Sequence, residues 1–109
     1  DILDRLLLDK NPFVQKEAAN AIMQLDIEQL SSYLMRLLKT RNDFSILFSV
    51  DILSKMRSTS AIAIFQDQYT HYSDSVRLKV IQTLKIIASP TAYHALIEFL
   101  KKEKQEKKS

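Results

Sequence analysis

Residues 11–25 read NPFVQKEAANAIMQL, and residues 73–87 read SDSVRLKVIQTLKII. Each stretch begins with a side chain that caps helices well, because its oxygen accepts a hydrogen bond from the first free amides of a helix. Apolar side chains then recur three and four positions apart, which places them along one face of a helix. A comparable stretch begins at Asn42, so the pattern returns at Asn11, Asn42 and Ser73, every 31 residues and without an insertion. The sequence therefore predicts a helical repeat.

Each 31-residue unit is expected to hold two helices. The first helices are predicted over 12–25, 43–57 and 74–88, and the second helices over 27–40, 59–71 and 90–103. Capping residues mark all six starts: Asn11, Asn42 and Ser73 for the first helices, and Asp26, Ser58 and Ser89 for the second. Residues 1–10 match a second helix, so we expect them to be the remainder of an earlier, truncated unit of a longer parent chain.

The two quoted stretches share a cap, a valine and a series of alanines and leucines with a known family. They resemble the HEAT-like repeats of the short phycobilisome-lyase type, and Arg77 stands at the arginine position of that pattern, whereas Gln15 and Ile46 depart from it. The resemblance implies an all-α, right-handed α-solenoid of about three and a half two-helix repeats. It also implies that second helices line a concave side, along which such proteins bind partners.

The expected organisation is one HEAT-like domain over 1–103, with repeats at 11–41, 42–72 and 73–103, followed by a charged tail at 104–109. The composition of the 109 residues agrees with helices, because glycine is absent and only two prolines occur. Without glycine, a phosphate-binding loop of the P-loop or Rossmann type is excluded. Without cysteine, disulfides and thiolate metal sites are excluded, and a reducing cytoplasm is the expected location.

Charge is concentrated at the end of the chain. Residues 101–109 hold five lysines and two glutamates, which accounts for the whole net charge of +3 and leaves residues 1–100 neutral. Nucleic-acid-binding domains usually carry positive charge on a face of the fold. We therefore expect a solvated helix end or linker here, with a polyanion-binding tail as the alternative. No apolar run approaches the roughly 18 residues of a membrane span.

Charged residues recur at the 31-residue offset along the predicted second helices. The expected concave row, with its neighbours, consists of Arg5, Arg36, Lys39, Asp67, His94 and Glu98. This row is basic toward the N-terminus and acidic toward the C-terminus, so acidic side chains would face the phosphates of a nucleic acid. A protein partner of complementary charge tolerates such a row. A solvated face without a ligand is the alternative.

Apolar residues also fall outside the predicted core stripe of the first helices. They are Leu47, Val50, Leu78 and Ile81, and we expect them to form an exposed apolar strip on the outer wall. Such strips mark contacts with another chain or domain. A different curvature of the stack, which would bury them, is the alternative.

Residues typical of catalysis or metal binding do not form a recognisable pattern. His94 and Glu98 stand one helical turn apart, but a zinc site needs three or four ligands. We therefore expect no enzyme activity, metal or cofactor, and a protein–protein interaction or scaffold module. The alternative is nucleic-acid binding through Arg5, Arg36, Lys39 and the lysine tail. The exposed ends, residues 1–10 and 89–103, are candidates for end-to-end self-association.

Overall fold

The computed structural model describes residues 2–108, with the side chains of residues 2–106. Asp1 belongs to the predicted truncated unit over 1–10 and Ser109 to the predicted tail, and both lie outside the described residues. The helices are α1 (Ile2–Leu7), α2 (Pro12–Met23), α3 (Ile27–Leu37), α4 (Asp43–Lys55), α5 (Ala61–Gln68), the short 3-10 helix η1 (Tyr69–His71), α6 (Asp74–Ile87) and α7 (Pro90–Lys108). The described chain contains no strand, so the prediction of an all-α fold is confirmed.

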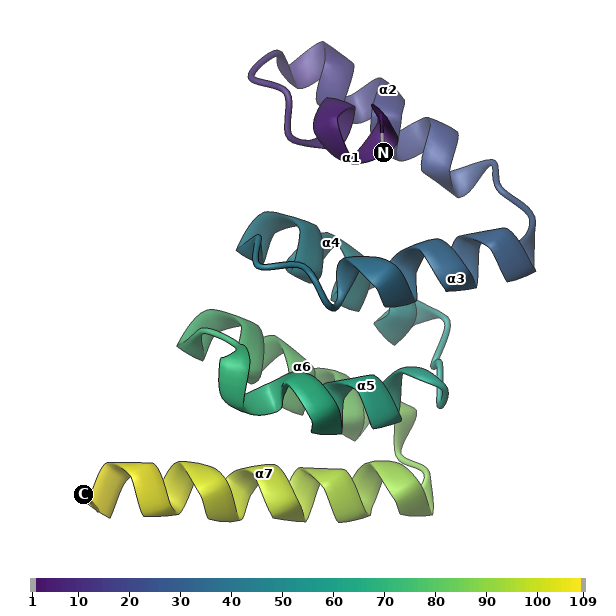
Figure 1. Cartoon of the computed structure of the whole chain (residues 1–109). Coiled ribbons are helices and arrows are strands. Elements are labelled where there is room, and N and C mark those ends of the chain that lie inside the picture. Colours follow the sequence, from purple (N-terminus) through teal and green to yellow (C-terminus); the bar gives the residue numbers. More distant parts are fainter. Residues whose placement is uncertain (1, 109) are drawn as a thin grey trace.

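The helices follow one another in space in the order of the chain. Figure 1 shows α1 and α2 at one end, α3 to α6 between, and α7 at the other end. Helix α4 packs against both α3 and α6, α6 packs against α7, and α1 packs against α2. The described part of the chain is elongated, with extents of 43 × 28 × 18 Å. None of its helices combines the length and the apolar character needed to cross a membrane.

Five of the six predicted caps are confirmed by side-chain hydrogen bonds. Asn11 accepts from the Phe13 amide, Asn42 from Ser45, Ser73 from Val76 and Ser89 from Ala92, at 2.9 to 3.4 Å. Asp26 accepts from the Gln29 amide at 2.9 Å, and the Gln29 side chain accepts from the Asp26 amide in return. Each of these bonds satisfies an amide that has no partner within its helix.

The predicted cap at Ser58 is wrong. Arg57 adopts a left-handed conformation with a φ of 50° at the end of α4, and the Ser58 amide then donates to the Leu53 carbonyl at 3.1 Å. Ser58 therefore closes the preceding helix. Helix α5 begins only at Ala61, after Ser60, whose side chain makes no capping bond.

The last helix also differs from its predicted bounds. Helix α7 does not end at residue 103 but continues to Lys108, so the predicted tail is helical over 104–108. Glu106 of this stretch and Glu103 just before it bind Arg77 of α6. Lysine, glutamate and glutamine are favourable helix residues, and these contacts hold the final turns against the rest of the fold.

One hydrophobic core runs through the stack. It includes Leu7 of α1, Ile22 of α2, Leu34 of α3, Leu53 of α4 and Phe99 of α7, all fully buried. Side-chain hydroxyls cross between helices inside it: Ser49 donates to the Leu34 carbonyl and Tyr72 to the Leu38 carbonyl, both at 2.7 Å. Among the described residues, no buried side-chain nitrogen or oxygen lacks a hydrogen-bond partner.

Candidate interaction surface

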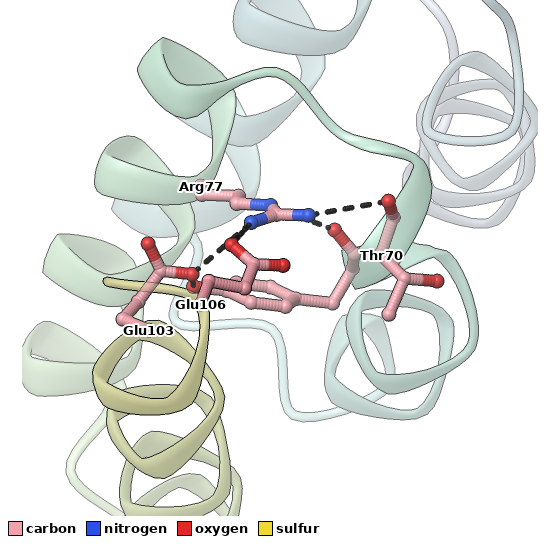
Figure 2. Close-up of polar contacts among 5 residues, drawn as sticks. Thr70, Arg77, Glu103 and Glu106 are labelled. Atoms are coloured by element: carbon pink, nitrogen blue, oxygen red, sulfur yellow. Dashed lines mark hydrogen bonds and ion pairs between the residues drawn. The ribbon is translucent and has the colours of Figure 1, made fainter. Parts of the chain in front are cut away.

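The Arg77 side chain makes four hydrogen bonds. Its Nε donates to the Tyr69 carbonyl and one terminal nitrogen donates to the Thr70 carbonyl, both at 3.2 Å. The other terminal nitrogen donates to Glu103 at 3.2 Å and to Glu106 at 2.6 Å. Figure 2 shows this guanidinium, which comes from α6, reaching η1 on one side and α7 on the other. Arg77 thereby joins three elements.

Tyr69 completes the cluster around Arg77. Its ring stacks on Phe99 with a centroid distance of 3.9 Å, and the Arg77 guanidinium carbon lies 5.0 Å from its centroid. The hydroxyl donates to Glu103 at 2.8 Å. Burial, followed by this bond to Glu103, raises the pKa of Tyr69. Burial opposes the charge of Arg77, but its bond to Glu106 and the two nearby carboxylates outweigh burial and raise its pKa. Near neutral pH the hydroxyl is protonated and the guanidinium charged.

A hollow of about 450 Å³ adjoins the cluster between α6 and α7. Its lining consists of Asp74, Arg77, Leu78, Ile81, Leu100, Glu103 and Glu106. Three of these side chains are apolar, while three carboxylates and one guanidinium give the remainder a formal charge of −2. The hollow therefore combines apolar side chains with a net negative charge.

Apolar side chains continue from the hollow along α7. Tyr93, Ile97 and Leu100 are 56%, 51% and 49% exposed, and Leu78 of α6 is 57% exposed. The spacing of four and then three residues puts the α7 side chains on one face of the helix. We call the surface formed by Leu78, Ile81, Tyr93, Ile97 and Leu100 the end face.

The predicted outer apolar strip is only partly exposed. Leu78 is exposed, and Ile81 is half-buried; both line the hollow. Leu47 is half-buried against the core. Val50 is 0% exposed, so its assignment to an exposed strip is wrong. The reason is that α6 packs over α4, which covers this side of α4, whereas no element of the described chain covers the corresponding side of α6.

The predicted concave row lies on α1, α3, α5 and α7, with Lys39 just after α3. Arg5, Arg36, Lys39, Asp67 and His94 are exposed, and Glu98 is half-buried. Within the row, Arg36 pairs with Asp4 of α1 at 2.8 Å. Glu98 accepts from Gln66 of α5 and pairs with Lys102, both at 3.2 Å. The row is thus engaged with neighbouring helices at two of its positions.

Asp4 also accepts a hydrogen bond from the Tyr33 hydroxyl, and the Arg36 guanidinium carbon lies 4.9 Å from the Tyr33 ring centroid. Burial opposes ionisation of Asp4, but hydrogen bonds from Arg36 and Tyr33 outweigh it and lower the pKa of this carboxyl. Burial and the bond to Asp4 raise the pKa of Tyr33.

The sequence indicated residues 89–103 only as a candidate end for self-association; it did not single out the stripe of Tyr93, Ile97 and Leu100 or the carboxylates beside it. The signals were present in α7: Tyr93, Ile97 and Leu100 have helical spacing, and Glu103 and Glu106 are three positions apart within the lysine-rich stretch. Their partner Arg77 stands 26 and 29 residues earlier in the chain. Without the packing of α7 on α6, the sequence does not indicate which side of α7 these residues occupy.

Within residues 2–106, no group of three or more His, Cys, Asp or Glu side chains is arranged to hold a metal ion. Comparisons of the sequence with family models, with curated proteins and with solved structures found no match.

Proposed function

We propose that this chain is a non-enzymatic protein–protein interaction or scaffold module built as a short HEAT-like α-solenoid, and that it binds its partner through the end face. The observation that carries the proposal is the apolar surface that Leu78, Tyr93, Ile97 and Leu100 present to solvent. A contiguous exposed apolar surface with a polar rim is typical of a protein contact site.

Several contacts support the repeat architecture, because they join residues about one 31-residue unit apart. Asp4 and Arg36, and Gln66 and Glu98, are each separated by 32 residues. The Tyr72 hydroxyl binds the Leu38 carbonyl 34 residues earlier, and Ser73 binds Asp43 30 residues earlier. Bonds at nearly constant separation are expected when like units stack on one another.

The alternative, nucleic-acid binding through the basic side chains, has less support. Arg36 already pairs with Asp4, so its charge is partly neutralised by the protein itself. In α7, Glu103 and Glu106 alternate with the lysines, and both carboxylates take part in the Arg77 cluster. A phosphate backbone favours surfaces where cations are not interrupted by carboxylates.

Quantitative affinity capture tests the proposal. The wild-type chain is compared with Leu78→Asp/Ile97→Asp, which places two charges on the end face, and with Arg5→Glu/Lys39→Glu, which reverses two exposed charges of the row. Circular dichroism and thermal unfolding verify that all three chains are equally folded. We expect the wild-type chain to capture a protein partner. The amount captured should fall at least tenfold with the end-face variant and remain unchanged with the row variant.

Two results would overturn the proposal. One is capture of nucleic acid alone, removed by salt and lost in Arg5→Glu/Lys39→Glu. The other is a protein partner whose capture does not change in Leu78→Asp/Ile97→Asp.

A further inference from the structure

Three positions of the end face have counterparts one unit earlier in the chain, 31 residues before them. Ile81, Tyr93 and Leu100 correspond to Val50, Ile62 and Tyr69. All three counterparts are at most 1% exposed. Helices cover them, since α6 packs on α4 and α7 packs on α5, with Phe99 of α7 stacked on Tyr69. Three of the five positions of the end face therefore repeat, with apolar residues, a surface that elsewhere in this chain receives helices.

The register of the α7 side chains also suits a helix. Tyr93, Ile97 and Leu100 form a stripe along α7, and Leu78 and Ile81 form the facing edge on α6. An apolar ridge of an incoming helix, with residues at spacings of three and four, packs between two such rows.

The charged side chains around the hollow indicate what kind of partner can bind there. Asp74 is exposed at the start of α6, and the side chain of Glu106 is 54% exposed, whereas the side chain of Arg77 is only 10% exposed. Arg77 is used in binding both glutamates and two backbone carbonyls. The hollow therefore presents carboxylate to solvent and hides its single cation. Lys104, one turn beyond Leu100 on α7, does not line the hollow.

We infer that the end face binds one amphipathic helix of a partner protein, with the apolar side of that helix on Leu78, Ile97 and Leu100 and a lysine or arginine beside Asp74 and Glu106. The inference rests on the proposed function and specifies the partner. A helix is the expected occupant because α6 packs on α4 in the same way one unit earlier, and a basic helix is expected because the lining of the hollow carries a net negative charge.

The test uses two fluorescent synthetic peptides with identical leucines at helical spacing, one with lysines and one with glutamates on the polar side. Binding to the full chain is measured by fluorescence anisotropy, and the site is located by amide chemical shifts in NMR spectra. We expect the lysine peptide to bind about tenfold more tightly than the glutamate peptide and to shift amides of α6 and α7.

Variants of the chain separate the apolar and the charged parts of the site. Leu78→Asp/Ile97→Asp is expected to remove binding of the lysine peptide. Asp74→Lys is expected to weaken it about fivefold. The matched control is Glu28→Lys, because Glu28 is also an exposed acidic residue in the first turn of a helix, α3, and the change in net charge is the same. This control should leave peptide binding unchanged.

Each other outcome has a distinct meaning. Equal binding of both peptides at the end face overturns the basic helix but leaves the proposed function standing. If neither peptide binds, but Leu78→Asp/Ile97→Asp still abolishes capture of a protein partner, the inference that the partner contributes a helix is wrong and the proposed function stands. If sedimentation velocity detects a dimer that this variant abolishes, the face belongs to a second copy of the chain and the inference is wrong.

Discussion

Two clusters in this molecule use the same three chemical groups but differ in burial. In each, a tyrosine hydroxyl donates to a carboxylate, and an arginine that pairs with that carboxylate lies about 5 Å from the tyrosine ring. At the α1–α3 contact these are Tyr33, Asp4 and Arg36, and the Arg36 side chain is 47% exposed. At the α6–α7 contact the Arg77 side chain is only 10% exposed and has two carboxylate partners.

The comparison indicates that burial determines how much the same set of contacts contributes to the stability of the fold. The pair of Arg36 and Asp4 is partly screened by water, because the Arg36 side chain is 47% exposed, and it is expected to contribute little to stability. Arg77 instead donates to two backbone carbonyls and both glutamates while its own side chain is only 10% exposed, so its loss removes four hydrogen bonds made from a buried position. We therefore expect the α6–α7 cluster to matter more for folding.

The largest effect is expected for Arg77→Met. This change keeps much of the side-chain volume but removes one hydrogen-bond donor from each of four acceptors, which are Glu103, Glu106 and two carbonyls of η1. We predict a loss of about 3 kcal/mol in the free energy of unfolding. Urea unfolding followed by circular dichroism measures it. A loss below about 1 kcal/mol, the range of an exposed pair, would remove the distinction between the two clusters.

An intermediate effect is expected for Tyr69→Phe. The ring stack on Phe99 remains, while Glu103 loses one hydrogen bond, so we predict a loss of about 1 kcal/mol. Tyr33→Phe makes the same chemical change in the other cluster and is the matched control. Its effect on urea unfolding should be smaller, because Tyr33 is 8% exposed and solvent reaches its cluster, whereas Tyr69 is 0% exposed. An equal loss in both variants would contradict the role assigned to burial.

The smallest effect is expected for Asp4→Asn, about 0.5 kcal/mol at neutral pH. The pKa of Asp4 is lower in the folded chain than its ordinary value of 3.8, so the charged form stabilises the fold. This contribution is complete above the unfolded pKa and is lost as the pH falls through the folded pKa. The difference between wild type and Asp4→Asn, from urea unfolding at pH 7 down to pH 3, should be constant above about pH 5 and shrink below pH 4. A difference that grows on acidification would contradict the direction of the pKa shift.

Local features were predictable from the sequence, and features that depend on distant packing were not. Asn11, Asp26 and Ser73 act as caps because a cap needs only its own helix. Ser58 fails because the left-handed turn at Arg57 takes its amide for α4. The capping propensity of a serine does not reveal that the preceding helix will use its amide.

The candidate site follows the same division. Leu78 was identified because its position on the helix depends on local periodicity. Val50 was assigned to the wrong environment because its burial depends on α6, which begins more than twenty residues later. Glu103 and Glu106 were not identified because the sequence analysis summed the charges of residues 101–109. Such a sum does not show which of these residues lie on the side of α7 that faces Arg77.

The measurement that tests the central claim most directly is an NMR titration of the labelled chain with its captured partner. We predict that the amide and methyl signals of Leu78, Ile97 and Leu100 shift on binding, while the amide signals of Arg5, Lys39 and Asp67 in the predicted concave row remain unchanged. Shifts concentrated along that row, with the end face unaffected, would contradict the account and return the binding site to the charged residues of α1, α3 and α5.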